Sequence, residues 1–200
     1  MTELRVLVVE WIKKALLEVQ EYVRLCFAAA QATFSRPFYA RDVIEQIDVI
    51  GLGSLTVVLL TGFFTGAVLA LQGGQTLDQF GARPVVGRLV SASMIKELGP
   101  VLTGLMLTGR VGSGIAAELG SMMVTDQINA LRALGTDPIR KLVVPRALAG
   151  IFMAPVLTVI SDFVGIFGGW IVARYQLQVA SGLFWSSVTR DARYMQDIWM

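Results

Sequence analysis

The stretch VIGLGSLTVVLLTGFFTGAVLALQ, residues 49–72, decides the fold of this chain. It contains no charged residue, and about 20 apolar residues are enough for a helix to cross roughly 30 Å of hydrocarbon. Two further apolar stretches follow, at about residues 85–117 and 142–173. We therefore predict an all-α integral membrane protein with at least three transmembrane helices.

The composition favours a membrane as the solvent of this chain. Its 200 residues are 54% hydrophobic and 16% charged, whereas soluble domains are about 45–50% apolar. The basic residues gather in short segments between apolar stretches, which argues against a nucleic-acid-binding protein. Histidine is absent and Cys26 is the only cysteine, which excludes Ser/His/Asp triads, disulfides within the chain and His/Cys zinc sites. We predict a non-enzymatic protein that holds no metal.

The N-terminal region, residues 1–48, is predicted to be interfacial. Apolar residues recur at helical spacing between Leu4 and Ala30, with charged residues mostly opposite. Such an amphipathic helix, carrying Trp11 and Tyr22, suits the plane of the lipid headgroups. A helix packed on a soluble core is the alternative. Residues 49–200 then form the membrane domain, which we expect to be incomplete at its C-terminus because the last residues resemble the approach to another span.

Basic residues are divided unevenly between the two sides of the predicted spans. Six Lys or Arg residues precede residue 49 and four lie between residues 118 and 146, whereas five lie in the segments on the other side. Because Lys and Arg are enriched in cytoplasmic segments, we expect a cytoplasmic N-terminus.

The second and third apolar stretches contain unusual residues. As one helix, residues 85–117 would be about 50 Å long, so this helix must protrude from the membrane, bend or break. We predict the interruption at Gly99-Pro100, where the proline has no N–H. Arg110 and Asp162 are membrane-embedded charges, which cost at least ~2.5 kcal/mol at mid-membrane and often have a role. For Arg110 we expect a structural role, in a buried pair with Glu118 or a contact with a backbone carbonyl. For Asp162 a purely structural role in helix packing is the alternative. Glycines spaced four apart, Gly62 with Gly66 and Gly165 with Gly169, predict close helix contacts.

A short helix is predicted at about residues 125–135, between the second and third spans. Thr125 is expected to cap its N-terminus, and Gly135 followed by Pro138 is a stop signal. The helix would carry an apolar ridge that fits a groove in a partner protein, formed by Ile128, Leu131 and Leu134. The alternative is a loop helix folded back on its own bundle.

An ordered set of motifs resembles the MlaE permease family over roughly residues 51–185. The motifs are Lys96-Glu-Leu-Gly-Pro-Val101, Thr108-Gly-Arg-Val-Gly-Ser113, Ala117-Glu-Leu-Gly120, Thr125-Asp-Gln-Ile-Asn-Ala-Leu131 and Gly135-Thr-Asp-Pro138. The resemblance implies a homodimeric ABC-type permease with five spans, of which the last two are absent here. It would move phospholipids between the bacterial inner membrane and a periplasmic MCE-domain lipid carrier, in a system that maintains outer-membrane lipid asymmetry. A chloroplast envelope is the alternative location.

The resemblance also implies a coupling helix that receives motion from a cytoplasmic ABC ATPase subunit. Its residues here are Asp126, Gln127, Ile128, Leu131, Leu134 and Gly135. The family more often has Glu at the position of Asp126. The chain has no Gly-x-x-x-x-Gly-Lys-Ser/Thr loop, so we expect ATP to be bound by the partner and no cofactor by this chain.

A lipid-binding cavity is predicted at the outer end of the first span. Apolar residues recur there at helical spacing, and two charged residues stand at the same expected depth; the residues are Leu69, Leu77, Phe80, Lys96 and Glu97. Lys96 would meet a lipid phosphate as a point charge. Helix packing for the apolar residues and interfacial snorkelling for the charged pair are the alternatives. An ion-coupled secondary transporter or channel, using Glu97, Arg110 and Asp162, is the competing function.

Overall fold

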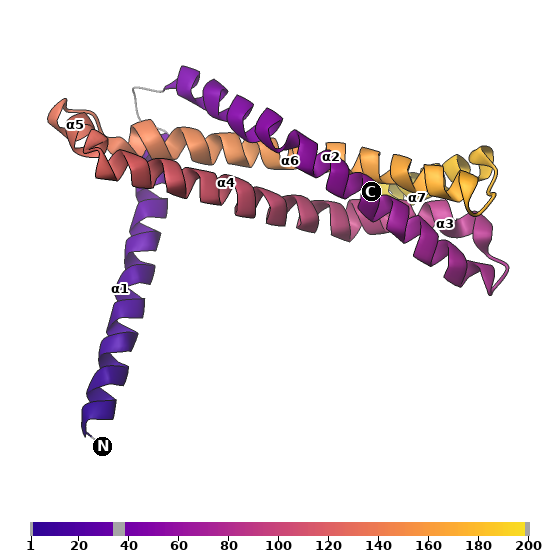
Figure 1. The fold of residues 1–200 in the computed structure, drawn as a ribbon, viewed down its shortest axis with the longest axis horizontal. Helices are drawn as coiled ribbons and strands as arrows, with labels where there is room; N and C mark the ends of the chain where they lie inside the picture. The colour runs from indigo at the N-terminus through magenta and orange to yellow at the C-terminus, as the bar shows by residue number, and fades with distance from the viewer. Residues whose placement is uncertain (1, 34–38, 199–200) are drawn as a thin grey trace. The chain divides into compact units, whose positions relative to one another are not determined.

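The computed structural model describes residues 2–33 and 39–198, and these residues form helices without any β-strand (Figure 1). The long helices are α1 (Thr2–Thr33), α2 (Ala40–Asp78), α4 (Gly99–Val124) and α6 (Val144–Tyr175). Shorter helices are α3 (Val86–Ser93), α5 (Gln127–Ala133) and α7 (Ser181–Ile198). A 3₁₀ turn at Arg83–Val85 leads into α3, and π-helical turns at Met94–Leu98 and Ile139–Val143 lead into α4 and α6. The all-α prediction is confirmed.

Three continuous helical segments are long and apolar enough to cross a membrane: Ala40–Asp78, Arg83–Val124 and Ile139–Tyr175. Each contains one of the three predicted spans. Large apolar side chains point outward along all three, among them Leu60, Phe64, Leu105, Phe152 and Phe163. Contiguous apolar surface of this kind is rare on soluble monomers and suits a hydrocarbon solvent, where lipid tails are as apolar as leucine. The prediction of three membrane-spanning helices is confirmed.

The chain divides into two compact units, which are described separately. Unit 1 comprises residues 1–46 and 121–149, and unit 2 comprises residues 47–120 and 150–200. In unit 1, α1 contacts the π turn at Ile139–Val143. The Lys141 ammonium forms an ion pair with Asp42 and lies 4.6 Å from the ring centroid of Tyr39. These contacts fasten the beginning of α2 to the beginning of α6.

In unit 2, α2 and α6 touch backbone to backbone. A Cβ atom built on Gly66 would lie 1.8 Å from the Gly165 carbonyl oxygen, and one built on Gly62 would lie 2.8 Å from Ser161 Oγ. On α6, a Cβ atom on Gly169 would lie 3.1 Å from the Gly66 carbonyl oxygen. Because only glycine permits such proximity, these positions set the distance between the helices. The predicted close contacts of both glycine pairs are confirmed.

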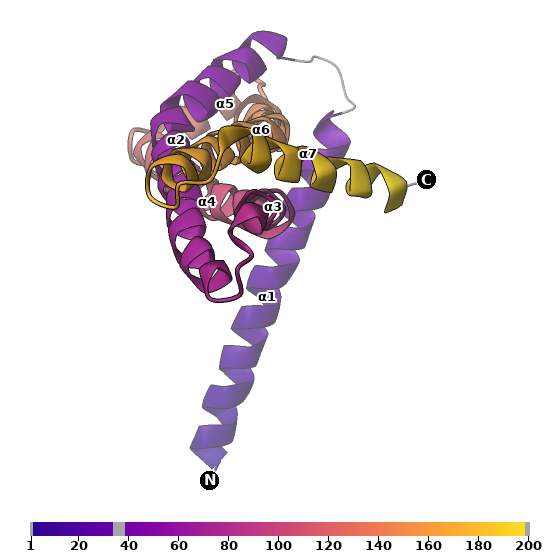
Figure 2. The same ribbon diagram turned by 90° about the vertical axis from the view of Figure 1, so that its right-hand side faces the viewer.

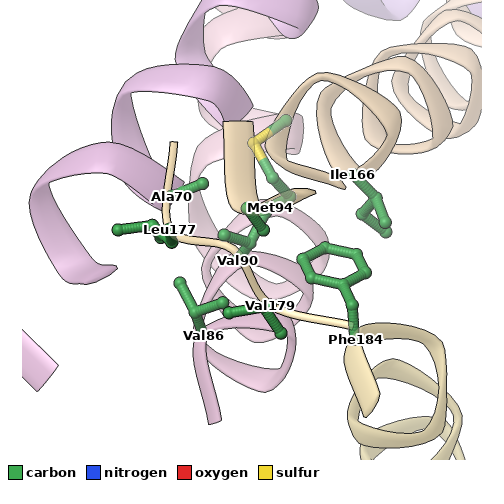
Figure 3. Packing of buried hydrophobic residues seen from close by; sticks show 9 residues of the cluster. Ala70, Val86, Val90, Met94, Ile166, Leu177, Val179 and Phe184 are labelled. Atoms are coloured by element: carbon green, nitrogen blue, oxygen red, sulfur yellow. The ribbon is translucent and has the colours of Figure 1, made fainter. Parts of the chain in front are cut away.

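A hydrophobic cluster in unit 2 joins the end of α2 to α3, α6 and α7. It consists of Ala70, Val86, Val90, Met94, Ile166, Ala173, Leu177, Val179 and Phe184, most of them labelled in Figure 3. The Phe184 side chain is fully buried and anchors α7 on α3; both helices can be followed in Figure 2. This cluster is the core that fixes the connection between the first two spans.

The second span is not broken at Gly99-Pro100. A π turn at Met94–Leu98 precedes these residues, and the Gly99 N–H bonds the Met94 carbonyl oxygen five residues earlier. Proline at position 100 lacks an N–H and disturbs the carbonyl one turn before it, and the wider π turn accommodates that mismatch without ending the helix. The expected interruption is therefore a local change of helix type.

Replacing Gly66 with Ala is expected to destabilise unit 2, because the new methyl group would overlap the Gly165 carbonyl and force α2 away from α6. Overpacking of this kind costs about 1–3 kcal/mol, which thermal unfolding in detergent would measure as a lowered Tm. Gly53→Ala is the matched control in α2, since its nearest neighbour would be the Arg110 side chain at 3.8 Å. Equal Tm values for the two variants would contradict the packing described here.

Candidate functional site

The helix α5 begins at a sharp turn after α4. Asp126 occupies the N-cap position with φ 55°, in the left-handed region, and its Oδ1 accepts a hydrogen bond of 2.9 Å from Asn129 Nδ2. The predicted cap, Thr125, is wrong: its hydroxyl donates instead to the Ser121 carbonyl at 2.8 Å, within α4. Thr125 directly follows the last residue of α4, and the next residue, Asp126, takes the cap position of α5.

The end of α5 is closed by backbone hydrogen bonds. The Gly135 N–H donates to the Arg132 carbonyl and the Thr136 N–H donates to the Leu131 carbonyl, both at 3.0 Å. Gly135 has φ 74°, so this is a Schellman motif that requires a left-handed residue after the helix. Asp137 Oδ1 then accepts the Ile139 N–H at 3.0 Å and begins the segment leading into α6. The predicted stop at Gly135 is confirmed.

The predicted apolar ridge of α5 is divided between two environments. Ile128 and Leu131 are half-buried within unit 1, whereas Leu134 is 80% exposed. Two residues that the sequence reading missed, Met123 and Val124, are 73% and 87% exposed at the end of α4. The sequence feature that could have predicted this exposed surface is the pair of large apolar residues directly before the Thr-Asp turn. The exposed apolar surface of this turn therefore consists of Met123, Val124 and Leu134.

A shallow groove of about 260 Å³ runs beside α5, entirely within unit 1. Its lining residues are Met122, Gln127, Ala130, Leu131, Leu134, Lys141 and Leu142. Leu131 thus faces a groove formed with the beginning of the third span. Asp126 and Gly135 stand exposed at the two ends of the helix. We define this region, residues 122–135, as the α5 turn.

The five residues of the predicted lipid cavity lie in two kinds of environment. Leu69 and Leu77 pack against the hydrophobic cluster of unit 2, which was the alternative reading for them. Phe80 follows α2 and is 77% exposed. Lys96 and Glu97 are exposed on the π turn of the second span. Their contact with lipid stays a prediction.

The two charges predicted to be membrane-embedded lie on different spans, Arg110 on the second and Asp162 on the third, and they lie beside different parts of the second span. A Cβ atom on Gly99 would lie 1.7 Å from Asp162 Oδ1, so this carboxylate sits directly on the helix backbone after the π turn. Asp162 is buried, and no residue in the described ranges donates a hydrogen bond to its Oδ1. Arg110 is exposed and points toward Gly53. Eleven residues separate Gly99 from Arg110, about 16 Å along the helix, so Asp162 and Arg110 do not form a pair.

These features define a multi-spanning α-helical membrane protein with a short, apolar helical turn between two of its spans. Residues 43–200 match the family model described as Permease MlaE. The chain belongs to the MlaE permease family, a family of ABC transporter permeases.

Several relatives are similar over most of this chain. A probable ABC transporter permease protein of Rickettsia felis is 45% identical over 172 residues, which cover 86% of this chain and 65% of the relative. The intermembrane phospholipid transport system permease protein MlaE of Haemophilus influenzae is 40% identical, with 78% and 60% covered. The chloroplastic protein TRIGALACTOSYLDIACYLGLYCEROL 1 of Arabidopsis thaliana is 33% identical, with 76% and 44% covered. The chain spans less than two thirds of the length of these relatives.

Replacing Gly135 with Ala is expected to loosen the end of α5, because an L-residue at φ 74° is strained by about 1 kcal/mol. Hydrogen exchange of the amides at positions 131–136 would then be several-fold faster, while the spans keep their protection. Gly120→Ala, at a position in α4 with open space around its Cβ, is the control. Unchanged exchange in Gly135→Ala would contradict the Schellman geometry.

Proposed function

We propose that this chain is the permease subunit of an ATP-driven transporter that moves phospholipids between the inner membrane and a separate MCE-domain lipid carrier. The observation that carries the proposal is the α5 turn, which exposes Met123, Val124 and Leu134 between two spans. An exposed apolar patch on a short helix is the pattern that a partner's groove recognises. The name of the Haemophilus relative, an intermembrane phospholipid transport permease, supports the choice of cargo.

The partner at the α5 turn is an ABC ATPase subunit. This sequence has no phosphate-binding loop of the Gly-Lys-Ser/Thr type, so the nucleotide must be bound elsewhere. The helix α5 is suited to transmit force, because its start follows the left-handed cap residue Asp126 and its end is closed by the Gly135 motif. Movement of α5 is therefore passed to α4 and to the beginning of α6 without being absorbed by a flexible loop.

The order of the spans, together with the basic residues, supports a proposed orientation in the membrane. Three successive crossings put the α5 turn on one side and the connections at residues 79–82 and 176–180 on the other. Arg132, Arg140 and Lys141 accompany the α5 turn, and basic residues favour the cytoplasm. The ATPase would then bind from the cytoplasm and the lipid carrier from the periplasm.

A second copy of the chain is proposed to pack against α4. Gly104, Thr108 and Gly112 recur every four residues and are exposed, and a Cβ atom on either glycine would meet nothing within 4 Å. Small residues at this spacing permit close helix approach in lipid. This open face supports a homodimer whose axis runs along α4.

Replacing the exposed Leu134 with Asp is expected to abolish ATPase binding, because a charge would enter the apolar centre of the interface. Loss of a central contact costs about 2 kcal/mol or more, so co-purification of a co-expressed ABC ATPase subunit should fall at least about tenfold. Leu134→Met keeps the apolar contact and is the control. Leu134 is preferable to Leu131 for this test, because Leu131 also contributes to the groove inside unit 1.

Two results would contradict the proposal. One is ATPase binding by Leu134→Asp at the level of Leu134→Met. The other is purified protein that carries no ATPase and moves solute down an ion gradient, which would establish the competing secondary transporter.

A further inference from the structure

One ionisable side chain of unit 2 lies outside both the α5 turn and the predicted lipid cavity. Asp162 is in the apolar helix α6, where residues 147–173 include no other charged residue. The residue is 9% exposed, and its Oδ1 accepts no hydrogen bond in the described part of the chain. The facing part of α2, within residues 49–77, has no charged residue. An isolated carboxylate in such surroundings is strongly unfavourable.

The charged residues of the second span do not compensate Asp162. Lys96 and Glu97 are exposed on the π turn, whereas the Asp162 carboxyl lies on the buried side of this segment. Arg88 and Arg110 each stand eleven residues from the glycine that Asp162 contacts, which is about 16 Å along a helix. The negative charge that an ionised Asp162 would carry therefore has no cation beside it among the described side chains.

The Asp162 carboxyl lies against a backbone oxygen. A Cβ atom on Gly99 would lie 1.7 Å from Asp162 Oδ1 and 2.8 Å from the Met94 carbonyl oxygen, so these two oxygens are neighbours. An ionised carboxylate is only an acceptor, and two acceptors in contact repel each other. A protonated carboxylic acid has one O–H donor. Only the protonated form makes the contact between these two groups attractive.

The π turn also lacks a donor for one of its carbonyl groups. The Gly99 N–H bonds the Met94 carbonyl instead of the Ile95 carbonyl. The next residue, Pro100, has no N–H, so the Ile95 carbonyl has neither the donor of an α-helical turn nor that of a π-helical turn. Where lipid excludes water, side chains of neighbouring helices satisfy such groups. The acid hydroxyl of Asp162, seated beside Gly99, is a donor of this kind.

We infer that Asp162 is a proton-binding site, in which the carboxyl is held as the neutral acid and donates a hydrogen bond to a backbone carbonyl oxygen of the π turn. The bound proton ties the third span to the second at the point where the second changes helix type. Loss of the proton would place a negative charge against backbone oxygens and weaken this contact. The inference concerns the two spans alone and depends neither on ATPase docking nor on the cargo.

Infrared spectroscopy of the full chain, reconstituted in lipid nanodiscs at neutral pH, tests the protonation state. A carboxylic acid and a carboxylate have well-separated stretching bands. The difference spectrum between the unaltered protein and Asp162→Asn is expected to contain the band of the acid. Glu97→Gln is the matched control, because it removes an exposed carboxyl from the π turn and should change carboxylate bands instead. Loss of a carboxylate band in Asp162→Asn would overturn the inference.

Thermal unfolding of two variants tests the hydrogen bond. Asp162→Asn is always neutral and keeps N–H donors, so its Tm is expected to stay close to that of the unaltered protein. Asp162→Leu has the same number of side-chain heavy atoms but no donor, and it should lower the Tm by several degrees because a buried acceptor is left unsatisfied. Equal Tm values for these two variants, or a large loss in Asp162→Asn, would contradict the inference.

A bound cation is the other way to neutralise Asp162, and the same measurement separates it from a proton. The Tm of the unaltered protein is expected to be equal in sodium chloride and in choline chloride at the same ionic strength. A Tm that is higher in sodium chloride, and that loses this difference in Asp162→Asn, would assign a cation to the site and overturn the proton.

Discussion

The contact between the backbones of α2 and α6 is the constraint on which unit 2 depends. Within lipid there is no hydrophobic drive to bring helices together, so they associate through van der Waals packing at small residues. Gly66 and Gly165 supply that contact, and a Cβ atom on Gly165 would also lie 2.3 Å from Met94 Cε. The π turn that begins at Met94 is therefore packed into the space that the glycine leaves. The same packing holds Gly99 against Asp162.

The proposed docking surface belongs to unit 1. The α5 turn joins α4 to α6 with both ends fixed, and it offers apolar side chains to a proposed ATPase. The helices α2, α4 and α6 each contribute residues to both units.

Sequence patterns predicted those structural elements that are determined by residues close together in the sequence. The charge-free run at residues 49–72, the paired glycines and the Gly135 stop each follow from hydrophobic length, side-chain size or backbone sterics. The π turn could not be predicted. Pro100 indicates that a regular α-helical turn is disfavoured, but it does not indicate which helix type replaces that turn. The exposure of Met123 and Val124 depends on the tertiary arrangement of the turn between α4 and α5. Thr125 failed as a cap because Asp126 adopts a left-handed conformation that few non-glycine residues take.

The central claim is that three crossings separate the α5 turn from the connections at residues 79–82 and 176–180. Single cysteines at Gln79, Asn129 and Gln176, in a protein with Cys26 replaced by Ser, test it directly through labelling with a membrane-impermeant maleimide in spheroplasts. The account predicts that positions 79 and 176 are labelled in intact spheroplasts and that position 129 is labelled only after permeabilisation. Labelling of position 129 in intact spheroplasts together with the other two would contradict it.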